Sequence, residues 1–320
     1  MVKAVLLFIV GLLFLIKGGD WFVDGAVGVA RRLKLPEILI GATVVSIGTT
    51  LPEVIVSATS ALVGVPEMAY GNAVGSIICN TALIAAITIA VKPGLVERKS
   101  LKTPVIFFFA AAVLFALTAY TRGYFSRPVG IVLLGMFVLY IVTAVLQMKK
   151  QPVTEDKEEE QKVLSLPKAL LLLAIGAVVI AVGANLLVNN GTFIAETLGV
   201  PKSVIALTFV ALGTSLPELV TAITSLVKGH GSLSLGNVIG ANLFNLVLVC
   251  GTSVTLKPFS IPQEATFLGI NSSLILDLPL MFLVMLLMTV PALIRGRLYR
   301  IQGILLLIIY FAFCGIQFMM

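Results

Sequence analysis

The sequence predicts an all-α polytopic membrane protein whose ten transmembrane helices form two inverted-topology repeats of five. Its composition is the first reason: hydrophobic residues make up 59% of the chain and charged residues only 12%, whereas soluble domains carry about 25% charged residues. The second reason is a series of apolar runs, each able to cross about 30 Å of hydrocarbon as a helix of roughly 20 residues. The third is an internal repeat at a fixed separation along the chain.

The apolar runs are too long and continuous to be strands of a membrane barrel. In lipid, only α-helices and closed β-barrels satisfy all their backbone hydrogen bonds, so these runs are predicted to be helices. The ten expected spans lie near residues 4–28, 37–63, 68–91, 103–121, 128–148, 167–190, 202–227, 233–256, 271–293 and 302–319.

The basic residues indicate how these spans are oriented. The chain has 22 Lys and Arg, of which sixteen fall in one set of alternate loops and five in the other. Because Lys and Arg accumulate in cytoplasmic loops, we expect a multi-pass protein of the cell (plasma) membrane with both termini outside. The same distribution explains the basic balance of the chain without nucleic-acid binding.

The internal repeat is carried by polar residues and by glycine and proline. Glu53 and Glu218 lie 165 residues apart, and the same offset aligns residues 36–80 with residues 201–245 without a gap. Because each repeat contains an odd number of spans, the second repeat enters the membrane from the opposite side, an arrangement typical of secondary transporters. The expected organisation is a first repeat at 1–148, a cytoplasmic linker at 149–166 and a second repeat at 167–320.

Each repeat places one glutamate, in the sequence GT-x-LPE, deep within an apolar span. A carboxylate near the bilayer centre costs about 2.5–3.5 kcal/mol on insertion scales, so it marks a functional site by default. Pro52 and Pro217 precede the glutamates and cannot donate to the carbonyl four residues earlier, so we expect each helix to kink or break there. Loosened carbonyls, hydroxyls and two carboxylates suit Ca²⁺, which takes about 6–8 oxygen ligands. Helix packing would explain the glycines and threonines, but not the paired acids.

A second motif follows in the next span of each repeat, GNAVGSIICN at 71–80 and GNVIGANLFN at 236–245. Glycines four residues apart allow a neighbouring helix to approach closely. The first asparagine of each motif suits hydrogen bonding between helices as well as contact with a substrate. The last one, Asn80 or Asn245, lies deeper and is favoured for the ion site.

These paired motifs resemble those of the sodium/calcium exchanger family, within the calcium:cation antiporters, over essentially the whole membrane domain. The resemblance implies ten helices and four central cation sites, occupied alternately by Ca²⁺ or by several Na⁺. The chain would then be a secondary active antiporter and not an enzyme, functional as a monomer, with no cofactor beyond the transported ions. Animal members carry a large cytoplasmic calcium-sensing domain, so the short linker here suggests a prokaryotic type without that regulatory domain.

The resemblance also implies site residues by motif position. The Ca²⁺ ligands would be Glu53, Glu218, Thr49 and Thr214. The Na⁺ sites would share both glutamates and add Ser46, Thr50, Ser76, Ala211 and Ser215, with Ser46 and Ala211 contributing backbone carbonyls. Asn80 and Asn245 would line the middle of the cluster.

Two departures from the family pattern affect these expectations. Potassium-dependent relatives carry an acid at the position of Asn245, so the amide suggests a potassium-independent exchanger. Ala241 stands where the family usually has a serine matching Ser76, which leaves the Na⁺ stoichiometry open.

Two carboxylates also neutralise two protons, so an H⁺/Ca²⁺ exchanger is the main alternative, although the GNA-x-E pattern of the proton-coupled branch is missing. A cation channel ranks lower, since pores usually form from rings of identical subunits.

Three further polar residues, outside these motifs, also suggest local roles. Asp20 and Asp24 share a helical face at the expected cytoplasmic end of the first span, where they suit interfacial polar contacts or a role in ion access. His230, the single histidine, lies in a glycine-flanked loop and is expected to be solvated.

Overall fold

The computed structural model describes residues 1–66, 68–150, 164–199, 213–263, 266–267 and 269–319, and these residues are almost entirely helical. Nine helical segments among them are long and apolar enough to cross a membrane. The shorter apolar helix α10 (Leu216–Val227) occupies the end of the expected span at 202–227, of which residues 202–212 lie outside the described residues. The architecture is that of the predicted all-α polytopic protein.

The spans differ in how regular their backbone is. The single helices are α1 (Val2–Arg32), α6 (Arg98–Arg122), α7 (Arg127–Lys150), α8 (Leu166–Thr197) and α14 (Arg300–Met319). Other spans include a π-helical turn, as in α2 (Glu37–Ile40), η1 (Gly41–Val45) and α3 (Ser46–Val63); α4 (Met68–Cys79), η2 (Asn80–Ala85) and α5 (Ala86–Val91); α11 (Gly231–Phe244), η5 (Asn245–Cys250) and α12 (Gly251–Leu256); and η6 (Ser273–Asp277) with α13 (Leu278–Arg295).

Short antiparallel strand pairs join some of the loops. Strand β1 (Tyr124–Phe125) pairs with β2 (Phe259–Ser260), and β3 (Thr266–Phe267) pairs with β4 (Ile270–Asn271). These two-residue strands hold loop backbones together and contribute no membrane-spanning layer.

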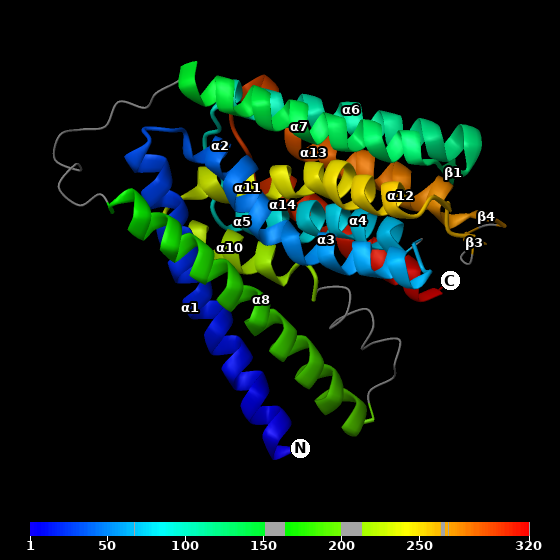
Figure 1. The fold of residues 1–320 in the computed structure, drawn as a ribbon, viewed down its shortest axis with the longest axis horizontal. Helices are drawn as coiled ribbons and strands as arrows, with labels where there is room; N and C mark the ends of the chain where they lie inside the picture. Colours follow the sequence, from blue (N-terminus) through cyan, green and yellow to red (C-terminus); the bar gives the residue numbers. More distant parts are fainter. Residues whose placement is uncertain (67, 151–163, 200–212, 264–265, 268, 320) are drawn as a thin grey trace.

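Helices α1 and α8 form an antiparallel pair that extends away from the other helices, with the N-terminus at its far end (Figure 1). Gly11 on α1 meets Gly183 on α8, and a Cβ added to either would lie 2.9 Å from the carbonyl oxygen of the other. Further along the pair, Gly25 abuts the backbone of Leu173. Small residues allow membrane helices to approach with their backbones in contact, so glycine is required along this seam.

Helix α11 lies within the remaining bundle and is buried along almost its whole length. It packs against the α2–η1–α3 span, α6 and α10. Gly236 meets the backbone of Ile38, and Gly240 meets Ala42 and the side chain of Ser46. Gly236 and Gly240 therefore bring the second repeat directly against the first, as the sequence predicts for glycines four residues apart. The same expectation is wrong for the first repeat, because Gly71 and Gly75 have no described atom within 4 Å of their Cβ positions.

The expected helix break at Pro52 is wrong. Helix α3 continues from Ser46 to Val63 with Pro52 inside it, and the irregular backbone lies earlier, in the π-helical turn η1. Membrane helices tolerate proline where local π adjustments and neighbouring groups satisfy the freed backbone. In the second repeat, a turn at 213–215 precedes α10, and Pro217 lies in the first helical turn, where a missing N–H donor has no cost.

The equivalent π-helical turns η2 and η5 begin at Asn80 and Asn245, which lie 165 residues apart. π-Bulges are frequent at functional sites. Only the two ends of the expected linker at 149–166 belong to the described residues, since 151–163 lie outside them.

Candidate cation site

Two glutamates from different repeats form the centre of the candidate site. Glu53 on α3 and Glu218 in the first turn of α10 are both fully buried. Within the described part of the chain, none of their carboxylate oxygens has a hydrogen-bond partner. Helices α3 and α10 pack together, and the two carboxylates are close enough for their charges to interact. Unpaired buried charges are costly, so a cation between these carboxylates would be stabilised by both.

Four of the neutral side chains expected at the site share this condition. Thr50, Asn80, Ser215 and Asn245 are buried, and their hydroxyl or amide groups have no partner among the described residues. The turn η5, which carries Asn245, packs against α3, and η2, which carries Asn80, packs against α10. About 90% or more of buried polar groups in proteins form a hydrogen bond, so a set of buried polar side chains without such partners indicates a ligand-binding site.

Two further expected ligands are held by Asn237 of α11. The Ser46 hydroxyl lies 2.7 Å from the carbonyl oxygen of Gly41 and 2.9 Å from that of Asn237. The Thr49 hydroxyl lies 3.2 Å from the side-chain oxygen of Asn237 and 3.4 Å from the carbonyl oxygen of Ser46. One asparagine of the second repeat therefore positions two residues of the first.

Three further residues complete the expected set. Ser76 is buried on α4, which packs against α3, and Thr214 is half-buried in the turn before α10. Ala241, where the family usually has a serine, is fully buried on α11. Ala211 lies outside the described residues.

A second buried polar network was missed from the sequence. The side-chain nitrogen of Asn242 donates to the Thr81 hydroxyl at 2.7 Å, and the sulfur of Met285 lies 3.2 Å from Asn242 Nδ2 and 3.3 Å from Thr81 Oγ1. The network joins α11, η2 and α13 beside Asn80. The 165-residue offset pairs Asn242 with an isoleucine, so a search for repeated polar residues passes over it.

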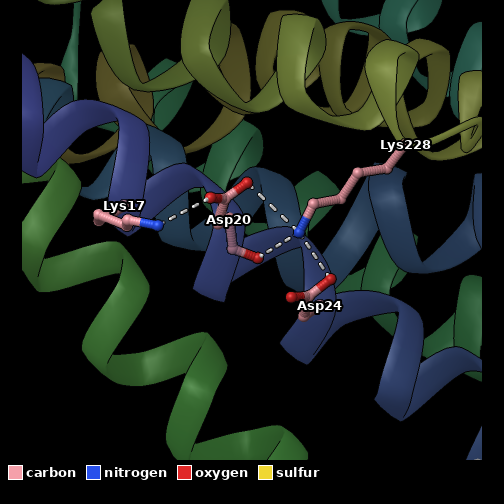
Figure 2. Close-up of polar contacts among 4 residues, drawn as sticks. All are labelled: Lys17, Asp20, Asp24 and Lys228. Carbon is pink, nitrogen blue, oxygen red and sulfur yellow. Dashed lines mark hydrogen bonds and ion pairs between the residues drawn. The ribbon is translucent and has the colours of Figure 1, made fainter.

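An ion-pair cluster connects α1 to the end of α10 (Figure 2). The Lys228 ammonium lies 2.8 Å from Asp24 Oδ1, 3.4 Å from Asp20 Oδ1 and 3.1 Å from the Asp20 carbonyl oxygen. Lys17 approaches Asp20 at 4.0 Å from the other side. In this arrangement both aspartates make interfacial polar contacts, the first of the two roles considered for them.

Comparisons with known proteins identify the family. The family described as sodium/calcium exchanger protein matches residues 3–146 and 168–319. The chain is 34% identical over 328 residues to the putative antiporter CaxA of Alkalimonas amylolytica, covering 100% of this chain and 99% of the relative. It is 29% identical over 350 residues to the sodium/calcium exchanger MaX1 of Methanosarcina acetivorans, covering 98% of each.

Solved structures of the sodium-calcium exchanger NCX_Mj share the fold. The one soaked with 2.5 mM Na⁺ and 10 mM Sr²⁺ has a TM-score of 0.81 at 30% identity, covering 97% of each chain. Together with the apolar spans, these matches describe a multi-pass membrane transporter and not an enzyme. The chain therefore belongs to the sodium/calcium exchanger family and is a cation antiporter for Ca²⁺.

Proposed function

We propose that this protein exchanges Ca²⁺ for Na⁺ across the plasma membrane, without a requirement for K⁺. The observation that carries the proposal is the pair of carboxylates of Glu53 and Glu218, which are fully buried and have no hydrogen-bond partner among the residues that the structure describes. One Ca²⁺ balances their two charges, and the neighbouring hydroxyl and amide oxygens provide further hard ligands of the kind that Ca²⁺ takes. The names of the relatives MaX1 and NCX_Mj, both sodium/calcium exchangers, support Na⁺ as the counter-ion.

In this proposal Ca²⁺ and Na⁺ compete for overlapping ligands. Ca²⁺ binds Glu53, Glu218, Thr49 and Thr214. Na⁺ ions use the same glutamates with Ser46, Thr50, Ser76, Ala211 and Ser215, while Asn80 and Asn245 line the middle of the cluster. Sharing the carboxylates makes the two occupied states exclusive, which is the condition for coupled exchange.

Alternating access is proposed to come from sliding of the α1–α8 pair against a fixed core. The pair is packed tightly on itself through glycines, and it meets the rest of the bundle mainly at α10, the start of the α2–η1 span and α3. Neither helix contributes an acid to the central cluster, so both can move while the ligands stay in place.

The proposed organisation is a monomer with both termini outside and two repeats at 1–148 and 167–320, joined by the linker at 149–166. The boundaries are supported by helix limits that recur at the 165-residue offset, such as those of η2 and η5. Exchange of Ca²⁺ for H⁺ is the alternative, because two protons would also neutralise the two glutamates.

The test is ⁴⁵Ca²⁺ uptake into proteoliposomes loaded with Na⁺, with K⁺, or at acidic internal pH. We expect uptake only against Na⁺. Uptake driven by the proton gradient alone would establish H⁺ as the counter-ion, and downhill flux without any trans ion would indicate a channel.

The site assignment has its own variants. Glu53→Gln and Glu218→Gln keep the size of the side chain and remove one charge, and each is expected to abolish Ca²⁺ flux in a folded protein. Glu196→Gln, an exposed carboxylate near the end of α8, is the matched control and should exchange normally. Retained Ca²⁺/Na⁺ exchange in either central variant would refute the assignment.

A further inference from the structure

Beyond Glu218, helix α10 carries two further buried hydroxyls, those of Thr221 and Ser225. Both side chains are 0% exposed, and neither hydroxyl has a hydrogen-bond partner among the described residues. Thr221 and Ser225 lie three and seven residues after Glu218, so the three side chains share one face of the helix. The proposed cation site uses Glu218 and leaves both hydroxyls unexplained.

A buried threonine without a hydrogen bond is an exception in this protein. Within the described part of the chain, these buried threonines form hydrogen bonds: Thr43, Thr49, Thr81, Thr88, Thr118 and Thr289. Most of them approach a backbone carbonyl three or four residues earlier, as Thr289 does at 2.7 Å from the Met285 oxygen. The buried threonines without a partner are Thr50, an expected Na⁺ ligand, and Thr221. Thr221 therefore resembles an ion ligand more than a packing residue.

The spacing of the two hydroxyls matches the depth of the membrane. At about 1.5 Å per residue, Thr221 lies about 4.5 Å and Ser225 about 10.5 Å along the helix axis from Glu218. The hydrocarbon layer extends about 15 Å to either side of its centre. Helix α10 ends at Val227, two residues after Ser225. The hydroxyls therefore continue the polar groups of the central cluster most of the way to the end of this span.

The neighbouring face of α10 is covered by α1. A Cβ added at Gly19 of α1 would lie 2.6 Å from Val220 Cγ1 and 2.9 Å from Thr224 Oγ1. Each of these residues precedes a hydroxyl residue by one position, which corresponds to a turn of about 100° around the helix. Sliding of the α1–α8 pair, the movement proposed above, would change the cover beside the hydroxyl face while α10 keeps its packing against α11.

Helix α3 of the first repeat has no such series beyond Glu53. At the 165-residue offset, Thr221 corresponds to Val56, which is 44% exposed, and Ser225 corresponds to the half-buried Ser60. The buried hydroxyl of this part of α3, on Ser57, already accepts a hydrogen bond from Asn72 Nδ2 at 2.9 Å. The series of free hydroxyls is therefore specific to the half of the membrane that α10 crosses.

We propose that the hydroxyls of Thr221 and Ser225 are transient cation ligands on the route between the central cluster and the solvent at the Lys228 end of α10. A Ca²⁺ ion that leaves Glu218 loses carboxylate ligands before water replaces them, and hydroxyl oxygens are hard ligands that supply part of the missing coordination. The inference rests on the proposed ion site. The two hydroxyls act on the rate of passage and not on the affinity of the central site.

The test is Ca²⁺/Ca²⁺ self-exchange, measured as ⁴⁵Ca²⁺ uptake into proteoliposomes loaded with unlabelled Ca²⁺, because this flux does not depend on which counter-ion is used. Thr221→Val keeps the shape of the side chain and removes the hydroxyl. We expect the self-exchange rate to fall about tenfold, which corresponds to about 1.4 kcal/mol in the barrier. Ser225→Ala should cause a smaller loss, because Ser225 is nearer the solvent. Equilibrium Ca²⁺ binding by the detergent-solubilised chain should be unchanged in both variants.

The melting temperature separates this role from packing. A buried hydroxyl without a partner costs free energy, so its removal should leave the melting temperature unchanged or raise it. Thr289→Val is the matched control, since Thr289 is also a buried threonine of a membrane span but its hydroxyl is bonded to the backbone. This control should exchange Ca²⁺ at the native rate.

A second measurement tests the route without relying on a rate. The background is Cys314→Ser, because the other two cysteines are buried. In this background, a charged methanethiosulfonate reagent should modify Ser225→Cys from the Lys228 face of oriented vesicles and not from the opposite face.

Three results would overturn the inference: native self-exchange in both Thr221→Val and Ser225→Ala, slower exchange together with a lower melting temperature, or no modification of Ser225→Cys from the Lys228 face. Each of these leaves the central site intact. Exchange retained by Glu218→Gln would instead refute the proposed ion site itself, so the two failures are distinguishable.

Discussion

The contact between Lys228 and the aspartates of α1 provides a direct test of how the α1–α8 pair is held against the core. Lys228 follows α10, the helix that carries Glu218 at its other end, and its ammonium contacts Asp20 and Asp24. Lys228→Gln removes the positive charge and keeps much of the side-chain length. If α1 moves relative to α10 during transport, Lys228→Gln destabilises the position of α1 seen in this structure relative to the position that α1 takes in the other transport state.

The expected magnitude follows from the exposure of the groups. The side chains of Lys228, Asp20 and Asp24 are 27%, 37% and 50% exposed. Partly exposed ion pairs are worth about 0.2–1 kcal/mol each, so the two contacts together stabilise this arrangement by about 1 kcal/mol. That is roughly a fivefold change in the equilibrium between arrangements, and it should shrink as salt screens the charges.

The assay is the apparent Ca²⁺ affinity measured separately on each face of oriented vesicles. When a binding-competent state becomes less populated, its apparent affinity falls by the same fraction. Lys228→Gln should therefore weaken Ca²⁺ binding from one face by up to about fivefold and leave the other face equal or stronger. A double-mutant cycle that combines Lys228→Gln with Asp24→Asn measures the interaction between these two side chains. Asp24→Asn should have little effect on the Ca²⁺ affinity once Lys228→Gln is present.

Lys17→Gln is the matched control. Lys17 contacts only Asp20 among the residues that the structure describes, at 4.0 Å, with its own side chain 68% exposed. Its removal should change neither affinity measurably. Equal effects of Lys17→Gln and Lys228→Gln, or full additivity of Lys228→Gln with Asp24→Asn, would refute the idea that this cluster biases the position of α1.

Two further predictions concern the helix seam and the centre of the site. Gly25→Leu places a side chain against the backbone of Leu173 and should lower the melting temperature and the exchange rate, since overpacking costs about 1–3 kcal/mol. The control is Gly135→Leu on α7, where no described atom lies within 4 Å of the Cβ position; it should lower neither, and equal losses in the two variants would contradict the requirement for glycine along the α1–α8 seam. Asn245→Asp adds a third carboxylate beside α3 and is expected to make ⁴⁵Ca²⁺ uptake respond to K⁺, whereas uptake that stays indifferent to K⁺ would contradict the role given to this amide.

Much of the fold could be predicted because hydrophobic length is a direct physical requirement of the bilayer. The expected spans at 68–91 and 37–63 coincide with the helical limits Met68–Val91 and Glu37–Val63. The path of the backbone inside a span is less predictable. Pro52 stays within a continuous helix, and the π-helical turn forms at Gly41–Val45 instead, where Gly41 packs against α11. That choice depends on which neighbour satisfies the freed carbonyls, which a single sequence does not reveal.

The composition of the site was predictable only where the two repeats agree. Glu53 and Glu218 emerge from the repeat because both copies keep an acid. Asn237 was recognised as polar, but its bonds to the Ser46 and Thr49 hydroxyls depend on the close approach of α11 to α3. The prediction that the His230 side chain is solvated is wrong. Its ring lies against Glu37 and is only partly exposed, because the fold brings together residues that are far apart in the sequence.

The distribution of unsatisfied groups explains why the repeated residues are the ones suited to carry ions. Three repeat pairs have no partner among the described residues: Glu53 with Glu218, Thr50 with Ser215, and Asn80 with Asn245. Thr81, which has no polar counterpart in the second repeat, instead bonds with Asn242. A side-chain group already bonded to the protein would have to break that bond each time an ion arrives; the Thr49 hydroxyl is bonded to Asn237, so Thr49 would avoid this cost by offering its carbonyl oxygen. Groups left free in both halves bind and release a cation without this cost, and their inverted placement presents equivalent ligands toward either side of the membrane.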